Sequence, residues 1–195
     1  MELGKLKHEN IDKEHICCAI SNNKDIQVMS KKNWLKDRLD ACTRDSKAKG
    51  KKGLVILSSK KKMGFLSDPK YMSYKGFQTA DTAEPYFELM YLPFEEDASL
   101  PRFRDSVGRQ KDMPEGFVLY YTNQCPFTAK YVPILEGMAK ARNAVFQTVH
   151  IQTREDAQGC PSPFTTFSLF YDGQLVTHEI LSEKECDKIL ADKGM

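Results

Sequence analysis

The stretch CPFTAKYVPIL, residues 125–135, decides how the second half of this chain folds. It follows the apolar run 117–121, so we expect a buried strand that leads through a turn into a helix. Cys125 then stands at the helix N-terminus, where unpaired backbone N–H groups and the helix dipole favour a thiolate. Pro126 fits the first helical turn, which needs no N–H from that residue. The stretch therefore predicts a strand, a turn and a helix that begins at a reactive cysteine.

Further elements are expected downstream of this helix. Residues 145–151 and 165–171 are strand candidates, and the second leads through Asp172-Gly173 into a hairpin with residues 174–180. Ser182 can cap a terminal helix, with Glu185 three residues later completing a capping box. The predicted order is strand, helix, strand, short helix, strand, hairpin, strand and helix. Residues 116–195 are enough for one small domain of this kind.

This order of elements resembles the thioredoxin-like fold, as does the proline followed by Ile-Leu at residues 133–135. The resemblance implies that Cys125 is the nucleophile of an active-site turn. Thr128 replaces the second cysteine of the usual Cys-x-x-Cys pair, so the intramolecular disulfide cannot form there. The Thr128 hydroxyl can instead donate a hydrogen bond to the Cys125 sulfur. For Cys125 two interpretations stay open: a functional thiol, or a structural position in a binding module.

The loop before the strand candidate 165–171 carries Cys160, Pro161 and Pro163. Thioredoxin-like folds have a cis-proline here that faces the active-site cysteine, and either proline is a candidate for that part. Cys160 is a candidate resolving thiol for Cys125, and its alternative is an ordinary loop cysteine. On these grounds we expect Cys125 to react first with an alkylating reagent and to form a disulfide with Cys160 on mild oxidation.

The composition of the whole chain bounds its class. It has 195 residues, 41% of them hydrophobic, which is enough for one or two small domains. No apolar run approaches membrane-spanning length, so we expect no membrane partner. Residues 1–10 are charged and lack the apolar core of a signal peptide, which predicts a cytoplasmic protein. The six cysteines have no regular spacing and form no metal-ligand pairs with histidine, so we expect free thiols and no metal.

The first half of the chain differs from the second in charge. Basic residues outnumber acidic ones in residues 1–94, and the balance reverses afterwards. The polar segment 95–115, with two prolines and one glycine, reads as a linker between two regions that attract each other. In the first region we expect a strand, a helix capped by Ser30, a strand, a turn with a helix, and a final strand, at residues 16–20, 30–50, 54–57, 65–74 and 86–92.

Four stretches of this first region resemble the YoaP-type acetyltransferases, which are GNAT-superfamily enzymes with a YoaP-like domain at the C-terminus. The stretches are residues 11–20, 45–54, 74–77 and 80–89. The resemblance implies an α/β (α+β) chain with a GNAT-like domain at 1–94, a linker at 95–115 and a thioredoxin-like YoaP-like domain at 116–195. It also implies acyl transfer from acetyl-CoA to the amine of a small molecule or a protein.

The sequence departs from the GNAT pattern at the cofactor loop. GNAT enzymes bind the acetyl-CoA pyrophosphate with a Gln/Arg-x-x-Gly-x-Gly/Ala loop between a strand and a helix. No such loop is present, and the nearest string, residues 47–53, has the wrong glycine spacing. The chain reads as a GNAT domain with its middle deleted near residues 39–42, so we expect impaired acetyl transfer and assign no cofactor-binding residues. Tyr74 or Tyr71 is the candidate to protonate the CoA thiolate, against a packing role.

Three further expectations concern partners and the alternative function. The basic run 44–62 either attracts a phosphate-bearing ligand or is a solvated surface, and it lacks the interleaved aromatic residues of nucleic-acid binding. The strand candidate 16–20 has lost its family neighbours, so we expect it to pair with residues 54–57 or with another copy of the chain. The alternative to an acetyltransferase is a thiol-dependent redox or binding module that uses Cys125.

Overall fold

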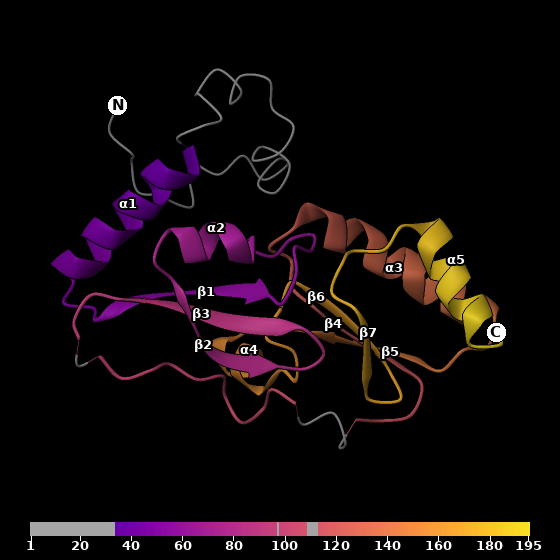
Figure 1. Ribbon diagram of the computed structural model, residues 1–195. Helices are drawn as coiled ribbons and strands as arrows, with labels where there is room; N and C mark the ends of the chain where they lie inside the picture. Colours follow the sequence, from indigo (N-terminus) through magenta and orange to yellow (C-terminus); the bar gives the residue numbers. More distant parts are fainter. Residues whose placement is uncertain (1–33, 97, 109–112) are drawn as a thin grey trace.

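The computed structural model describes residues 34–96, 98–108 and 113–195, and its elements form two sheets that lie side by side (Figure 1). The expected mixed α/β class is confirmed. The first sheet and its helices are α1 (Trp34–Ala48), β1 (Gly53–Ser59), α2 (Pro69–Tyr74), β2 (Gln78–Ala83) and β3 (Phe87–Pro93). The second group is β4 (Phe117–Tyr121), α3 (Pro126–Ala141), β5 (Phe146–His150), α4 (Arg154–Gly159), β6 (Phe167–Tyr171), β7 (Gln174–Thr177) and α5 (Glu183–Asp192).

The first sheet is antiparallel and has the strand order β1-β3-β2. One face packs against α1 and α2 through a small core of Met72, Phe77 and Met90, with Leu54 and Ile56 beside it. The hairpin partner β2 was not expected from the sequence, because its residues are mostly polar and small. It forms because β3 offers it a paired edge, with Thr79 opposite Met90. Local hydrophobicity carries no signal for a strand that is held by its neighbour.

The turn and helix expected around residues 65–74 are confirmed, and α2 occupies the second part of that stretch. Phe65 has a φ of 60°, outside the helical region, and the chain turns there. Asp68 is the N-cap, and its side chain accepts hydrogen bonds from the backbone N–H groups of Lys70 and Tyr71. Pro69 then occupies the first helical position. The helix therefore starts where a cap and a proline coincide.

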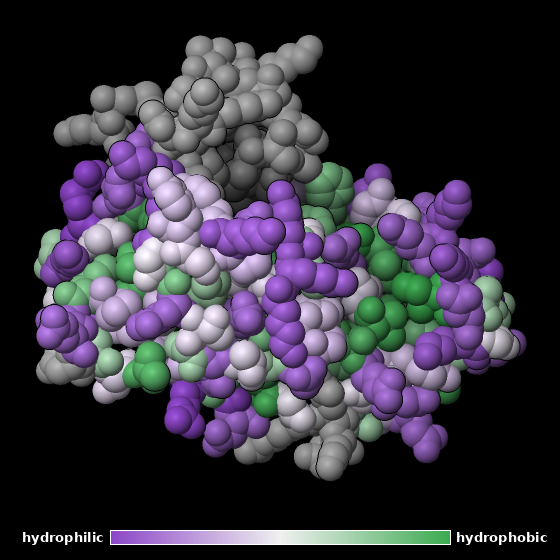
Figure 2. All heavy atoms as spheres, in the orientation of Figure 1, coloured by the Kyte–Doolittle hydropathy of each residue, from purple (hydrophilic) through white to green (hydrophobic). Residues whose placement is uncertain are grey.

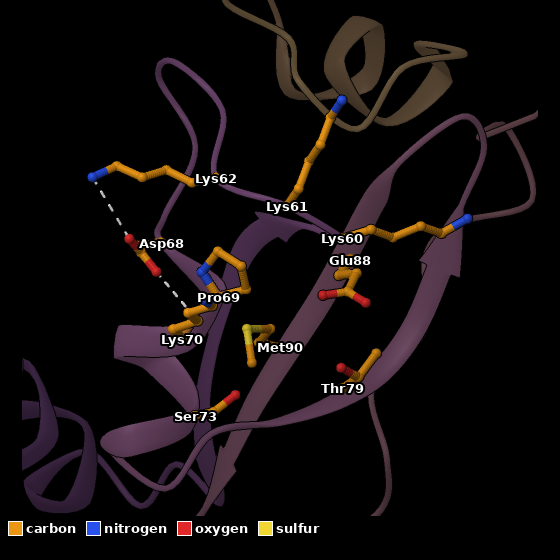
Figure 3. Close-up of a pocket in the computed structure, with 10 residues that line it drawn as sticks. All are labelled: Lys60, Lys61, Lys62, Asp68, Pro69, Lys70, Ser73, Thr79, Glu88 and Met90. Atoms are coloured by element: carbon orange, nitrogen blue, oxygen red, sulfur yellow. Dashed lines mark hydrogen bonds and ion pairs between the residues drawn. The ribbon is translucent and has the colours of Figure 1, made fainter.

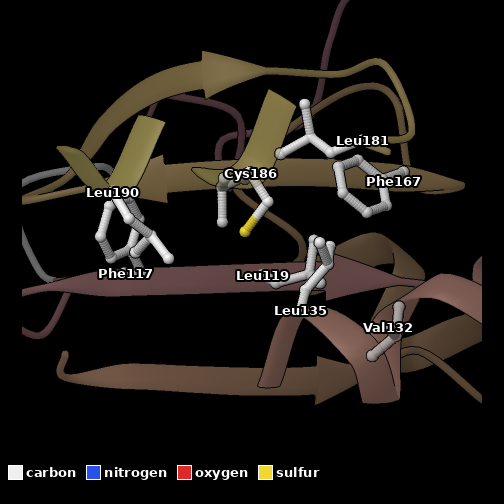
Figure 4. Packing of buried hydrophobic residues seen from close by; sticks show 9 residues of the cluster. Phe117, Leu119, Val132, Leu135, Phe167, Leu181, Cys186 and Leu190 are labelled. Atoms are coloured by element: carbon white, nitrogen blue, oxygen red, sulfur yellow. The ribbon is translucent and has the colours of Figure 1, made fainter. Parts of the chain in front are cut away.

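The second sheet has the strand order β5-β4-β6-β7, with β4 parallel to β5 and antiparallel to β6. The order of elements expected from the sequence is confirmed for residues 117–192. Helices α3 and α5 cover one face, and Figure 4 shows side chains of α5 meeting those of β4 and β6 in the core. The buried cluster consists of Phe117, Leu119, Val132, Leu135, Phe167, Leu169, Leu181, Cys186 and Leu190.

Two local signals in this half are confirmed. Asp172 and Gly173 have φ values of 47° and 74°, which is the left-handed conformation that a tight hairpin turn requires. Ser182 and Glu185 form the expected capping box at the start of α5. Strand β7 ends at Thr177, short of the expected residue 180, because the next residue, His178, turns towards the first sheet.

His178 joins the two sheets and is completely buried. Its Nε2 lies 2.8 Å from the Gly64 carbonyl oxygen and its Nδ1 lies 2.6 Å from the Tyr86 hydroxyl. A carbonyl only accepts, so Nε2 carries the proton and Nδ1 accepts from Tyr86. The rings of Phe87 and Phe164 stand edge-on to the imidazole. We call this group, His178 with Tyr86, Gly64, Phe87 and Phe164, the histidine clasp.

The segment expected as a linker runs along both sheets. The Phe103 N–H donates to Asp81 of β2, and Ser106 donates to the Gln158 carbonyl of α4. The Gly108 N–H donates to the Pro161 carbonyl, 3.2 Å away. This segment therefore contacts elements that precede it in the sequence and elements that follow it.

The strand candidate 16–20 and the cap Ser30 lie outside the described residues, and so does the predicted pairing of residues 16–20. No helix in the described ranges is long and apolar enough to cross a bilayer. On the face seen in Figure 2, hydrophilic side chains run down the middle and an apolar area lies beside them, near α3 and α5.

Candidate functional site

Cys125 lies at the N-cap of α3, as the sequence predicts, but its side chain is only 2% exposed. Pro126 follows at the first helical position, and the Cys125 side chain makes no capping hydrogen bond. The expected helix N-terminus is therefore present, but the sulfur lies in the interior of the protein. Burial keeps reagents and substrates away from the sulfur.

Thr128 lies one turn into α3 and is fully buried. Its hydroxyl oxygen is 2.5 Å from the Thr122 carbonyl oxygen and 2.6 Å from the Cys125 carbonyl oxygen. The expected donation to the Cys125 sulfur is therefore wrong, because the hydroxyl has stronger acceptors in these backbone carbonyls. Thr128 ties the strand-to-helix turn together, which is a structural contribution.

Cys160 ends α4 and is also buried, with 1% of its surface exposed. Burial raises the pKa of the Cys160 thiol to about 11, although a backbone hydrogen bond at Ser162 opposes this. Burial, and in second place Cys160 itself, raises the pKa of the nearby Tyr120 hydroxyl. Cys160 is therefore a protonated thiol at neutral pH. Both Cys125 and Cys160 are free in the structure, and their pairing on oxidation stays a prediction.

The expectation of a cis-proline in the loop after Cys160 is wrong. Within the described residues the cis peptide bond is Glu84–Pro85, in the hairpin between β2 and β3. Neither Pro161 nor Pro163 takes that form. The loop is held by other contacts, since the Ser168 hydroxyl donates to Ser162 and lies equally close, 2.7 Å, to the Phe164 carbonyl oxygen.

Tyr74 lies at the end of α2, far from the cysteines in sequence, and is 80% exposed. The packing role weighed for it is not observed, because the residue that packs on the core of the first sheet is Tyr71. The Lys75 ammonium lies over both rings, 5.5 Å from the centroid of Tyr71 and 5.1 Å from that of Tyr74. The structure therefore does not bring Tyr74 together with Cys125, Thr128 or Cys160 into one site.

The glycines of residues 47–53 do not form a phosphate cradle. A Cβ on Gly53 would lie 2.2 Å from a ring carbon of Tyr91, so the tyrosine fills the space that the glycine leaves. Gly50 has a φ of 63° and follows α1, with nothing near its missing side chain. Both glycines are explained by packing and by the helix end. The residues present therefore do not fit the pyrophosphate of acetyl-CoA at this string.

A cleft of about 760 Å³ lies next to α2, on the face of the first sheet that α2 covers. Figure 3 shows Glu88, Met90 and Thr79 standing on the sheet between α2 and the loop that follows β1. The loop supplies Lys60, Lys61 and Lys62, and α2 supplies Lys70 and Ser73. We call this group the lysine cleft.

The loop lysines of the lysine cleft fan out from one another (Figure 3). Lys60 pairs with Glu84 at 3.2 Å, and Lys62 lies 3.7 Å from Asp68. Both pairs are well exposed, so each is worth little. Like charges repel, which explains why the three ammonium groups point away from one another.

The sequence alone did not identify the lysine cleft. The run Lys60-Lys61-Lys62 was visible as part of the basic stretch 44–62, and its position directly after a strand was the available signal. Glu88 and Lys70 come from other elements, so only the fold brings them there. Among the described residues, no cluster of histidine, cysteine and carboxylate side chains is arranged to hold a metal ion.

Comparison with known proteins gives two matches. A family model described as YoaP-like matches residues 146–188. A protein of Bacillus subtilis (strain 168), described as an uncharacterized N-acetyltransferase YoaP, is 30% identical over 243 aligned positions, which cover 95% of this chain and 97% of the relative. The alignment has more positions than this chain has residues, so it contains gaps where the relative has residues that this chain lacks. No solved structure matches.

Proposed function

Because the chain belongs to the YoaP family of N-acetyltransferases, we propose that it retains the family architecture but transfers acetyl groups from acetyl-CoA to amines only weakly. This proposal depends on how the glycines of residues 47–53 are used in the structure. Tyr91 fills the space beside Gly53, and the Gly50 N–H already donates to the Lys47 carbonyl at the helix end, so this string does not offer the open backbone cradle that a pyrophosphate needs. The acceptor of the acetyl group would be the amine of a small molecule or a protein.

The gaps in the alignment support an internal loss of residues. A GNAT-like domain needs a strand, a glycine-containing loop and a helix in succession to hold the cofactor phosphates. The described helix α1 begins at Trp34, and residues 5–49 contain no glycine. We infer that a loss of the loop left β1, β3 and β2 as the remaining end of the sheet, and the small three-stranded sheet supports this inference.

The thioredoxin-like assignment of residues 116–195 is also part of this proposal. It is supported by the strand order β5-β4-β6-β7 and by the helix that begins after Cys125. The alternative function, a thiol-dependent module using Cys125, is less well supported because both Cys125 and Cys160 are buried. We therefore propose a binding or structural part for this half, and a cytoplasmic location for the protein.

Calorimetric titration of the full chain with acetyl-CoA tests the proposal. We expect no binding in the micromolar range, since the phosphate contacts are missing. The Bacillus subtilis relative, titrated under the same conditions, is the comparison, because it has residues that this chain lacks. Micromolar binding of acetyl-CoA to this chain, or release of free CoA thiol in the presence of an amine as fast as with the relative, would overturn the proposal.

A further inference from the structure

Five polar side chains of the lysine cleft have no hydrogen bond or ion pair to the part of the chain that the structure describes. Two are the cations Lys61 and Lys70, one is the carboxylate Glu88, and two are the hydroxyls of Ser73 and Thr79. Four of these side chains are exposed and Glu88 is half-buried, so each is open to a partner from solution. Such a set, gathered around one cleft, is available to a ligand.

The cations of the cleft favour an anionic group. Lys60 and Lys62 are held only by exposed pairs, so their ammonium groups can turn towards an anion at small cost. Lys61 comes from the loop and Lys70 from α2. In Figure 3 the Lys61 side chain points away from Glu88, and because it is exposed it can turn towards an anion in the cleft. Lysine is a point-charge ligand for phosphate and carboxylate groups, and several lysines add their fields at one site.

Glu88 gives the cleft a preference for a cationic group as well. It lies on β3, half-buried and opposite Ser58 of β1, and its side chain faces the cleft beside Met90 and Thr79 (Figure 3). An ammonium group placed there would give the carboxylate a charge-assisted hydrogen bond. An acid without an amine would instead meet a like charge at this position. Glu88 therefore selects among the anions that the lysines attract.

We propose that the lysine cleft binds a small molecule that carries both an acidic oxyanion and a primary amine, with the oxyanion held by Lys61 and Lys70 and the amine by Glu88. The cleft volume of about 760 Å³ is within the range of small-molecule sites. The site requires no acetyl-CoA, so it goes beyond the proposed function and stands independently of it.

Calorimetric titration of the full chain without acetyl-CoA tests this site. The probes are O-phosphoethanolamine and β-alanine, which carry an amine with a phosphate or a carboxylate. The comparison compounds are inorganic phosphate, propionate and ethanolamine, each of which carries one of the two groups. We expect at least one amine-bearing acid to bind about tenfold more tightly than either of its halves, because a second charge-assisted contact forms. The phosphate and carboxylate arms identify which oxyanion the lysines prefer.

Three variants assign the contacts. Glu88→Gln should weaken binding of the amine-bearing acid about tenfold and leave inorganic phosphate unweakened. The double variant Lys61→Gln with Lys70→Gln should weaken both compounds. Lys51→Gln, which removes an exposed lysine outside the cleft, is the matched control and should bind as the parent does. Thermal unfolding of each variant shows that the fold is retained.

Several results would overturn the site. If phosphate or propionate alone bound as tightly as the amine-bearing acid, the cleft would be a basic surface without selection by Glu88. Equal binding by Glu88→Gln and the parent would exclude the assigned amine contact. Failure of every probe to bind would exclude the site itself, whatever the outcome with acetyl-CoA.

Discussion

At the scale of single residues, the thiols show how burial can reverse an order of reactivity expected from local position. Cys125 stands at a helix N-terminus but is buried, whereas Cys42 on α1 is exposed. We now expect limited iodoacetamide treatment at neutral pH to label Cys42 before Cys125 and Cys160, because a thiol must be accessible to react. Peptide mapping of the alkylated chain measures this order. Cys17 and Cys18 lie outside the described residues and are left out of the comparison.

Labelling in denaturant is the control, since unfolding removes the effect of burial and should equalise Cys42, Cys125 and Cys160. The pKa of Cys160, raised to about 11 by burial, predicts that it stays slow in the folded chain even at mildly alkaline pH. Labelling of Cys125 ahead of Cys42 would contradict this expectation. It would restore the thiol-dependent module as a function.

At the scale of elements, the capping box of α5 gives a pH-dependent contribution to stability. The Glu185 carboxylate accepts hydrogen bonds from the side chain and backbone of Ser182, and these lower the pKa of Glu185. Its contribution is therefore present above the ordinary pKa of glutamate and is lost as the pH falls through the lowered value. We expect Glu185→Gln to reduce the free energy of unfolding by about 0.5 kcal/mol at pH 7. The difference in free energy between the variant and the parent should disappear at acidic pH.

Urea unfolding across a pH series measures that difference. Glu183→Gln is the matched control, because it removes the same charge from the same helical turn without belonging to the capping box. It should cost less than Glu185→Gln at pH 7. Equal effects of the two substitutions would show that only the helix dipole acts on these carboxylates.

At the scale of the whole molecule, the histidine clasp holds the two sheets together. Burial, with a smaller effect of Glu179, raises the pKa of Tyr86 to about 12, so its hydroxyl remains a donor to His178 throughout the neutral range. We expect Tyr86→Phe to lower the free energy of unfolding by about 1 kcal/mol at pH 7, because His178 loses its donor. The raised pKa means that the contribution of Tyr86 is complete below pH 10.0 and is lost as the pH rises towards about 12.

Denaturant unfolding at neutral and alkaline pH checks both parts of this expectation. The gap between the parent and Tyr86→Phe should narrow from pH 10 to 12. Tyr74→Phe is the matched control, since its ring is exposed and its hydroxyl has no described hydrogen bond. A gap that stayed constant with pH would show that the Tyr86 hydroxyl is not part of the clasp.

Much of the second half of the fold was predictable because its signals act over a few residues. The Asp172-Gly173 turn needs a left-handed backbone at two adjacent positions, and the capping box needs Ser182 and Glu185 three residues apart. The helix after Cys125 follows from Pro126 and the apolar spacing behind it. Strand β2 was not predictable in this way, because its pairing with β3 and not its own residues makes it a strand.

The sequence by itself determined the order of the elements in the second half, the helix position of Cys125 and the absence of a glycine-containing cofactor loop. Only the tertiary structure decided that Cys125 is buried, that His178 joins two sheets, and that Glu88 lies among the lysines of the cleft. The physical reason is the range of the interactions. Caps, turns and helical spacing connect near neighbours in the chain, whereas burial, desolvation and charge complementarity depend on which distant segments pack together.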